Sequence, residues 1–362
     1  MATQLPLHPA HAQLGARFGE ADGYVVPVAY GDPAAEHGAV RARGGLIDRS
    51  ERGKIEVTGR DRVSFLQAML SSDVKALQPG QGSPAALLDV HGKIVALLVV
   101  HALSDRLVLE LDRRLVGPTL EALDRYLISE KVELEDASDR AGLLTVAGPT
   151  ARKMLEEVLG RTLPDLPVHH HVKAAGAGEG ARVVRNEESG EEGYDLWADP
   201  EDLPRLWERL RACGAEPVGR EAWNILRVEA GVVWHGVDVD ASTLLLEASL
   251  PGAYSLDKGC YLGQEVVARI TYRGHVNRRV VGFRFPDRRV PERGARVVVA
   301  GKDVGWITSA VVSPVLGSGL ALGQLRREHW EPGSRVEVTG PEGTLTAEVS
   351  TLPFYRRGPV GQ

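Results

Sequence analysis

The sequence has few cysteines, and its charge balance is slightly negative. Cys213 and Cys260 are the only cysteines among 362 residues. Two cysteines exclude a disulfide framework and cannot hold a four-thiolate cluster within one chain. Such low cysteine usage is typical of a reducing compartment. The net charge of −6 gives no general attraction to nucleic acid or to an anionic membrane. An anionic ligand would therefore need a local group of basic side chains.

Long apolar runs and internal repeats are also missing. The longest apolar stretch, residues 94–100, is far shorter than the ~20 residues of a membrane-spanning helix. Residues 1–30 hold no apolar run of the kind found in signal peptides. No segment repeats at the period of a solenoid or propeller. We therefore expect a cytoplasmic globular protein, long enough for two or three domains.

The first two-thirds of the chain mixes strand and helix patterns. Ile55 and Val57 alternate with polar neighbours, which predicts a strand. Asp61 precedes an apolar stripe that includes Leu66 and is expected to cap a helix. Residues 160–180, rich in proline, glycine and alanine, are expected to form a surface connection. Further strands are predicted at residues 94–100, 107–111 and 132–134, and further helices at residues 118–127, 203–210 and 223–230.

From about residue 280 the pattern changes to short β-rich runs separated by glycine and proline. No helical stripe interrupts them, which is typical of a small all-β barrel or sandwich. The predicted strands are residues 280–285, 296–300, 305–312, 320–325, 335–339 and 345–351.

The most unusual segment is residues 258–265, which read KGCYLGQE. Its two glycines permit tight turns and a close approach of the backbone to a ligand. An ammonium as near as that of Lys258 would favour the thiolate form of Cys260. The alternative is a turn with a buried structural cysteine, which composition alone makes equally reasonable. The ordered mixture of charged, aromatic and glycine residues favours a reactive loop.

Basic residues follow this segment, and they could form a binding site for carboxylates. A solvated strand face would explain them equally simply. Between residues 258 and 279 the basic side chains are Lys258, Arg269, Arg273, Arg278 and Arg279, against Glu265.

Glu229 is unusual because it lies in the apolar arc of a predicted helix. It is also near the C-terminal end of that helix, where the helix dipole disfavours a carboxylate. Such a carboxylate needs a partner, which could be a protein cation such as Arg227 or the ring nitrogens of a ligand. A structural ion pair and a ligand contact both remain open.

Two other polar segments have simpler interpretations. Residues 89–93, DVHGK, predict a hairpin turn before the buried strand. A functional role there would come from Asp89 or Lys93 at the mouth of the strand. Three adjacent histidines, residues 169–171, cannot easily converge on one ion because neighbouring side chains alternate. We expect them in a surface loop, and Cys213 to be a bystander.

The segment 258–265 resembles the signature of the YgfZ-type folate-binding proteins, and every fixed position of that signature is matched. These proteins are relatives of the glycine-cleavage T-protein, an aminomethyltransferase, and support iron–sulfur cluster maturation and repair. The resemblance covers most of the chain. It includes residues 45–50, 54–59, 65–67, 72–74, 227–231 and 305–324.

The resemblance implies an α+β fold in three parts, a cloverleaf around a cavity that binds tetrahydrofolate. Two interleaved α/β subdomains would comprise residues 1–52 with 140–275, and residues 53–139. A C-terminal β-barrel would comprise residues 276–362. The resemblance assigns Cys260 as the essential thiol, with Lys258, Tyr261, Gln264 and Glu265 around it. It assigns folate binding to Glu229, Arg227, Asp89, Lys93, Arg269 and Arg273, with Glu229 holding the pterin.

One departure from the T-protein pattern concerns the catalytic acid. T-proteins carry an Asp-Asp pair after a Gly-Gly turn. Aligning Gly92 on that turn places Ala96 and Leu97 at the pair, and neither can act as an acid.

The function expected from these residues is tetrahydrofolate-dependent assistance to iron–sulfur enzymes, without a resident metal. Its partners would be iron–sulfur client or assembly proteins. The first alternative is a folate-dependent aminomethyl- or methyltransferase. The second is a passive folate-binding protein with a structural Cys260. The sequence leaves catalytic turnover open.

Overall fold

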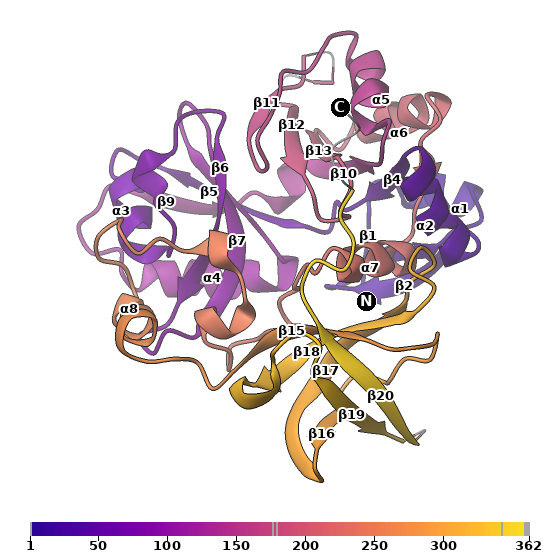
Figure 1. Cartoon of the computed structure of the whole chain (residues 1–362). Helices are drawn as coiled ribbons and strands as arrows, with labels where there is room; N and C mark the ends of the chain where they lie inside the picture. The colour runs from indigo at the N-terminus through magenta and orange to yellow at the C-terminus, as the bar shows by residue number, and fades with distance from the viewer. Residues whose placement is uncertain (1, 176, 179, 342, 358–362) are drawn as a thin grey trace. The chain divides into compact units, whose positions relative to one another are not determined.

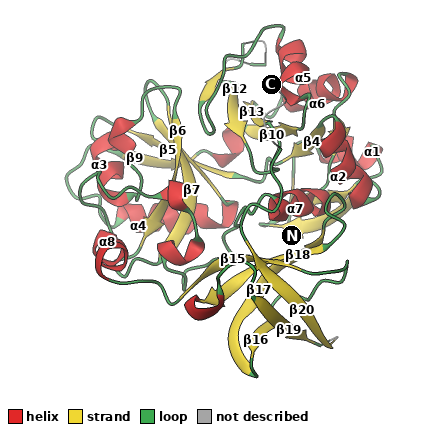
Figure 2. Cartoon of the chain, viewed as in Figure 1, coloured by secondary structure: helices red, strands yellow, loops and turns green. Residues whose placement is uncertain are grey.

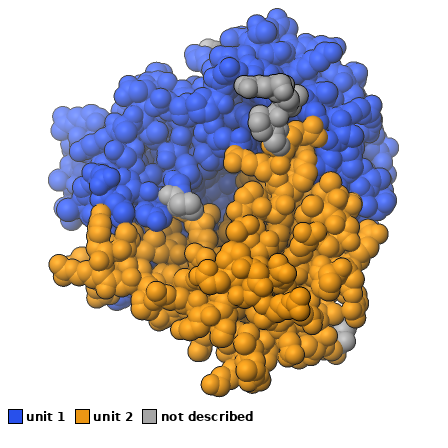
Figure 3. All heavy atoms as spheres, in the orientation of Figure 1, with its two compact units in different colours: residues 1–187, 192–222, 252–264 blue, residues 188–191, 223–251, 265–362 orange. Residues whose placement is uncertain are grey.

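The computed structural model describes residues 2–175, 177–178, 180–341 and 343–357. The chain divides into two compact units (Figure 3). The first comprises Met1–Glu187, Glu192–Ala222 and Gly252–Gln264. The second comprises Glu188–Glu191, Trp223–Pro251 and Glu265–Gln362. Both mix helices, strands and connecting loops (Figure 2).

The first unit contains a five-stranded antiparallel sheet in the order β6-β7-β8-β5-β9 (Figure 1). Every second side chain of a strand points to the same face. In β7 the side chains of Ala96, Leu98 and Val100 therefore share one face, and all three lie in the core. Helices α3 (Arg62–Met69) and α4 (Val116–Asp124) contribute Phe65 and Leu123 to that same core. The strands are β5 (Gly53–Thr58), β6 (Gly82–Leu88), β7 (Ile94–Ala102), β8 (Leu107–Leu111) and β9 (Glu133–Asp136).

A second sheet in the first unit has the order β11-β12-β13-β10-β4-β14. Its pairs are antiparallel except for β14 on β4. Helices α5 (Ala151–Leu159) and α6 (Leu203–Ala212) share a core with it through Leu155 and Trp207. The strands are β4 (Gly45–Asp48), β10 (Gly142–Ala147), β11 (His171–Lys173), β12 (Arg182–Asn186), β13 (Gly193–Ala198) and β14 (Glu216–Pro217). The second sheet is therefore built from chain segments that come before and after the first sheet in the sequence.

The N-terminal segment adds a small sheet in the order β1-β3-β2 to the first unit. Asp32 caps α2 by accepting a hydrogen bond from the amide of Ala34. The elements are β1 (Thr3–Gln4), α1 (His8–Gln13), β2 (Arg17–Ala21), β3 (Tyr24–Ala29) and α2 (Pro33–Ala42).

The second unit contains a closed barrel in the order β15-β18-β17-β16-β19-β20. Closure leaves no unpaired strand edge. Its interior is filled by apolar side chains that include Phe283, Ile307 and Leu325. The strands are β15 (Arg278–Arg284), β16 (Arg296–Val299), β17 (Lys302–Val312), β18 (Gly319–Arg326), β19 (Arg335–Gly340) and β20 (Gly343–Ser350). Helices α7 (Arg220–Glu229) and α8 (Gln264–Arg273) lie mostly in this unit.

The expected mixed fold with a C-terminal β-barrel is confirmed. The domain bounds expected from the sequence stay a prediction. Across the described ranges, no helix is both long and apolar enough to cross a bilayer.

Three local expectations were wrong. Asp61 precedes α3 but makes no side-chain cap, because its carboxylate accepts a hydrogen bond from the amide of Lys131. Helix α4 ends at Asp124, before Leu127. His171 is buried in β11, where its ring packs 5.7 Å from that of His101. The predicted surface connection, residues 160–180, contains β11, and its residues 176 and 179 lie outside the described residues.

Candidate functional site

The segment that carries Cys260 is tied to the end of α3 within the first unit. The amide of Leu262 donates to the carbonyl of Ala68 at 3.0 Å, and the amide of Ser255 donates to the carbonyl of Ser71 at 2.9 Å. The Ser71 hydroxyl donates to the carbonyl of Ala253. Both flanks of the cysteine are therefore fixed by hydrogen bonds to residues that end or follow one helix.

Lys258 has partners that sequence reasoning did not anticipate. Its Nζ donates to the carbonyl of Gln67 at 2.6 Å and also to that of Leu70. The ammonium lies 5.0 Å from the centre of the Tyr261 ring. Burial lowers the pKa of Lys258 to about 8, although the charge of Asp73 opposes that shift. The ammonium is thus directed at helix carbonyls, and its expected role as activator of the thiol stays a prediction.

Cys260 itself is exposed, as a reactive thiol must be. The glycine before it, Gly259, has φ +93°, and an added Cβ would meet nothing within 4 Å. Gly263, after it, has φ +78°, and an added Cβ would lie 2.6 Å from the carbonyl oxygen of Asp89. Gly263 is thus required both by its left-handed backbone and by the close approach of the β6–β7 hairpin.

Tyr261, Gln264 and Glu265 complete the loop in different ways. The Gln264 side-chain oxygen accepts a hydrogen bond from the amide of Tyr261 at 3.2 Å. The Tyr261 side chain is only 7% exposed, and its burial raises the pKa of the phenol to about 12. Glu265 is exposed in the first turn of α8. Gln264 and Tyr261 therefore shape the loop, whereas Glu265 makes no side-chain hydrogen bond or ion pair within the described part of the chain.

Asp89 forms the hairpin turn between β6 and β7. One oxygen of its carboxylate accepts hydrogen bonds from the amides of His91 and Lys93, each at 2.9 Å. This is the turn that the sequence predicts for aspartate at this position. The contact of Gly263 with Asp89 also brings the cysteine loop and this hairpin together. Folate binding by Asp89 and Lys93 stays a prediction.

Strand β7 contains no aspartate or glutamate. Ala96 is buried in the core that the sheet shares with α3 and α4. Leu97 is half-buried and pairs with Ala86 of β6. By strand alternation its neighbours on the same face are Val95 and Val99. These side chains can neither donate nor accept a proton.

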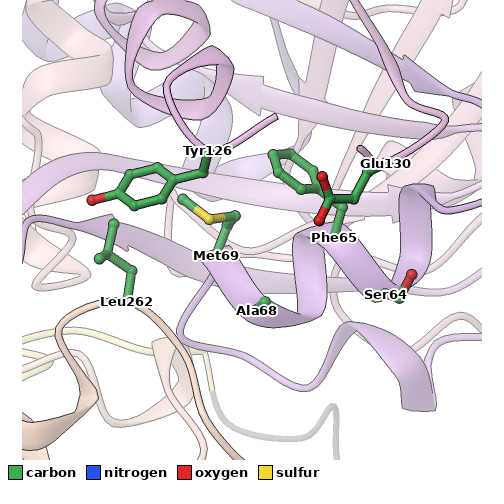
Figure 4. A pocket seen from close by; sticks show the side chains of 7 residues that line it. All are labelled: Ser64, Phe65, Ala68, Met69, Tyr126, Glu130 and Leu262. Carbon is green, nitrogen blue, oxygen red and sulfur yellow. The ribbon is translucent and has the colours of Figure 1, made fainter. Parts of the chain in front are cut away.

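A pocket of about 370 Å³ lies along α3 (Figure 4). Tyr126 and Leu262 lie at one end of it, and Phe65 and Glu130 at the other. Its lining is mostly apolar and suits an apolar group. The lining residues are Ser64, Phe65, Ala68, Met69, Tyr126, Glu130 and Leu262. Through Leu262 the pocket adjoins the cysteine loop.

Glu229 lies in the second unit, at the last residue of α7, and its side chain is fully buried. Its Oε1 accepts a hydrogen bond of 2.5 Å from the hydroxyl of Ser313, the residue after β17. Its backbone carbonyl accepts one from the amide of Tyr355. A buried carboxylate needs such donors, and it is an acceptor suited to the amino and ring N–H groups of a pterin.

Arg227 is buried beside Glu229 and belongs to a polar network of the second unit. It pairs with Asp238 and donates to the Ser309 hydroxyl at 2.7 Å. Its guanidinium also lies 4.4 Å from the centre of the Trp234 ring. These contacts favour a structural role for Arg227, and its assignment to folate binding stays a prediction.

Arg269 and Arg273 are exposed on α8 of the second unit. They are one helical turn apart, so both can present their guanidinium groups on the same side. A carboxylate of a folate tail is a suitable ligand for such groups. That assignment stays a prediction.

Sequence reasoning missed Gln67, Ser71 and Ser313 as parts of these arrangements. Gln67 and Ser71 act on a segment about 190 positions later in the chain. Ser313 reaches Glu229 from the barrel. No local pattern marks such pairings, because each depends on how distant elements pack.

The first unit thus carries a glycine-flanked thiol on a pinned loop, and the second a buried carboxylate beside a closed barrel. These features belong to a protein that contains both an α/β part and a C-terminal β-barrel.

Comparison with known proteins identifies the family. Residues 7–258 match the GCVT N-terminal domain, and residues 278–356 match the glycine cleavage T-protein C-terminal barrel domain. An aminomethyltransferase of Saccharopolyspora erythraea is 32% identical over 98% of both chains. One from Rubrobacter xylanophilus is 33% identical over 97% of this chain and 94% of its own. The crystal structure of glycine cleavage system aminomethyltransferase T from Bartonella henselae has a TM-score of 0.91 at 25% identity, covering 99% of this chain and 100% of its own.

The chain belongs to the glycine cleavage T-protein, or aminomethyltransferase, family. Tetrahydrofolate is the cofactor of this family, as the sequence led us to expect. The relatives are named aminomethyltransferases, so they favour the transferase alternative over the iron–sulfur role. The YgfZ-type branch is not distinguished by these comparisons.

Proposed function

We propose that this protein binds tetrahydrofolate and acts in the transfer of aminomethyl or methyl groups, as its relatives are named to do. The support is a match to the aminomethyltransferase family over nearly the whole chain. The observation that carries folate binding is Glu229, a fully buried carboxylate bound by Ser313. We also keep the cytoplasmic location as a prediction.

The residues present fit the pterin of tetrahydrofolate. The pterin edge presents N–H donors, and a buried carboxylate is the acceptor that binds them most strongly. Ser313 fixes one oxygen of Glu229 and so orients the carboxylate. When bound, tetrahydrofolate supplies the nitrogen atoms that carry a one-carbon group.

The chain's own part in such a transfer must differ from that of an enzyme with an aspartate on β7. Ala96 and Leu97 can hold no proton and stabilise no developing charge there. Cys260 is the exposed nucleophile of the loop, and its Sγ can lose or accept a proton. Gln264 and Gly263 keep the loop in its turn.

Turnover with an aminomethyl donor and tetrahydrofolate tests this proposal. The wild type should form one-carbon-loaded folate, and Glu229→Ala should lose this activity together with folate binding. Cys213→Ser is the control, because that half-buried thiol packs against the core that α5 and α6 share with the second sheet. A wild type that binds tetrahydrofolate without turnover would contradict the transferase function.

The second candidate function is thiol-dependent assistance to iron–sulfur enzymes, as in the YgfZ-type proteins. Two observations favour it: the KGCYLGQE loop presents an exposed thiol, and β7 lacks an acid. Its partners would be iron–sulfur client or assembly proteins.

Activity of iron–sulfur enzymes in cells separates the two candidates. Under the second, Cys260→Ser should lower that activity while the purified variant still binds tetrahydrofolate. If Cys260→Ser cells keep normal iron–sulfur activity, the second candidate is wrong.

A further inference from the structure

The end of α3 leaves carbonyl groups that need donors, and Lys258 supplies them. The helix ends at Met69, and the last four carbonyls of an α-helix have no partner within it. The Lys258 ammonium binds the carbonyl of Gln67 at 2.6 Å and that of Leu70. A cation at this end is also favoured by the helix dipole.

Gln67 returns the contact, so that the two residues bind each other reciprocally. Its Nε2 donates to the carbonyl of Lys258 at 3.0 Å and to the Asp73 carboxylate at 3.0 Å. Its Oε1 accepts a hydrogen bond from the amide of Lys75. The Gln67 side chain is only 7% exposed. It therefore joins α3, the turn that follows it and the cysteine loop.

We propose that Lys258 is a positioning residue: bound at the end of α3, it latches the loop and fixes where the Cys260 thiol is presented. The inference rests on Cys260 being the reactive group in the proposed function. It differs from the role suggested by proximity in sequence, in which the lysine charge activates the thiol.

The contacts distinguish these two roles. An activator needs only a charge near the sulfur, and a solvated ammonium would provide it. The Lys258 ammonium is instead partly desolvated, lies against the Tyr261 ring and donates to two carbonyls. Lys75 is a natural comparison, because it is exposed and its charge acts on the same ammonium. Within the described residues, the donor to the carbonyls of Gln67 and Leu70 is the ammonium of Lys258 and not that of Lys75.

Hydrogen exchange measures the latch directly through two backbone amides. The Leu262 amide donates to the carbonyl of Ala68 in α3 and the Ser255 amide to that of Ser71 just after it, so their exchange reports loop opening. Three variants are compared in a Cys213→Ser background, which leaves Cys260 as the single thiol: Lys258→Met, Lys258→Arg and Lys75→Met. Cys260 alkylation by iodoacetamide is followed against pH in the same proteins.

We expect Lys258→Met to speed exchange of the Leu262 amide by roughly tenfold or more, because the carbonyls of Gln67 and Leu70 lose their hydrogen-bond donor. Lys258→Arg should keep most of the protection, because a guanidinium can still donate to the carbonyls. Lys75→Met should leave it unchanged. The midpoint of the alkylation profile should move no further in Lys258→Met than in Lys75→Met.

Leu262 protection within about twofold of wild type in Lys258→Met would overturn the latch. Should that variant fold poorly, Ser71→Ala removes a neighbouring tie of the same loop and must also speed Ser255 exchange. Failure of the premise that Cys260 is the reactive group is seen separately, as full turnover and full cellular activity in Cys260→Ser, and does not alter the exchange result.

Discussion

Two charged side chains near the end of α7 are buried and yet held by polar partners. Arg227 is bound by Asp238, and Asp238 also accepts hydrogen bonds from the hydroxyls of Thr308 and Ser309. Glu229 is bound by Ser313. Breaking such a pair leaves the other charge buried without its partner, which costs more than the pair contributes. These residues are therefore sensitive to substitution even away from any ligand.

Arg227→Met is expected to destabilise the protein by about 3–5 kcal/mol, because it leaves the Asp238 carboxylate buried without its cation. The measurement is urea-induced unfolding followed by circular dichroism. Arg335→Met is the matched control, since that arginine is exposed on β19 of the same unit and should change stability by no more than about 0.5 kcal/mol. Equal effects of the two variants would show that the buried pair is not structural.

The Lys258 ammonium predicts a pH dependence of loop docking. Its pKa is about 8 when docked and 10.5 when solvated, so the open loop binds more protons between these values. Binding of the loop to the end of α3 should therefore become more favourable as pH rises from about 8 towards 10.5. Below pH 8 the free energy of binding includes the full cost of desolvating the ammonium. Leu262 exchange, corrected for the intrinsic rate, measures this. Protection that falls over that window in wild type, or rises equally in Lys258→Met, would contradict the prediction.

At the scale of elements, the cysteine loop is held on two sides, by the end of α3 and by the β6–β7 hairpin. Its two glycines meet different demands. Both glycines have a left-handed backbone. At Gly263 an added Cβ would also clash with the Asp89 carbonyl oxygen, whereas at Gly259 it would meet nothing within 4 Å. This difference makes the two glycines a matched pair of test positions.

Gly259→Ala should cost about 1–2 kcal/mol, the strain of a left-handed backbone in an L-residue. Gly263→Ala should cost more, because its Cβ would also lie 2.6 Å from the Asp89 carbonyl oxygen and push the hairpin away. Thermal unfolding of both variants gives the comparison. A Gly263→Ala protein as stable as Gly259→Ala would mean that the hairpin does not press on the loop.

Elements with a clear period were predictable from the sequence, and their ends were less so. The run of residues 94–100 became β7, and the six runs after residue 280 became the barrel, because alternation and glycine punctuation are local signals. The side chain of Asp61 does not cap α3, because its carboxylate accepts a hydrogen bond from the amide of Lys131, 70 positions later. The prediction that His171 lies on the surface was wrong, because its strand pairs with β12 and so joins a sheet that local sequence does not reveal.

The candidate site was predictable in its chemistry but not in its connections. The order of residues in the KGCYLGQE segment favoured an exposed thiol over a buried one, and Cys260 is exposed. The helical arc of Glu229 predicted its buried position. The direction of the Lys258 ammonium does not, because it depends on where α3 ends in space. Gln67 carries no mark in the sequence of its contact with residue 258.

At the scale of the whole molecule, family membership and local chemistry point in different directions. The chain matches aminomethyltransferases almost from end to end. Strand β7 nevertheless contains no carboxylate, and an exposed cysteine loop lies beside the hairpin that leads into it. Folate binding is the property that both candidate functions share, so it is the central claim.

Calorimetric titration of tetrahydrofolate into the wild type, Glu229→Ala and Cys260→Ser tests that claim most directly. The account predicts binding by the wild type and by Cys260→Ser, and loss of binding in a folded Glu229→Ala protein. Ser313→Ala should bind more weakly than wild type, because it frees one oxygen of the carboxylate. A wild type that does not bind tetrahydrofolate, or a Glu229→Ala protein that binds as tightly as wild type, would contradict it.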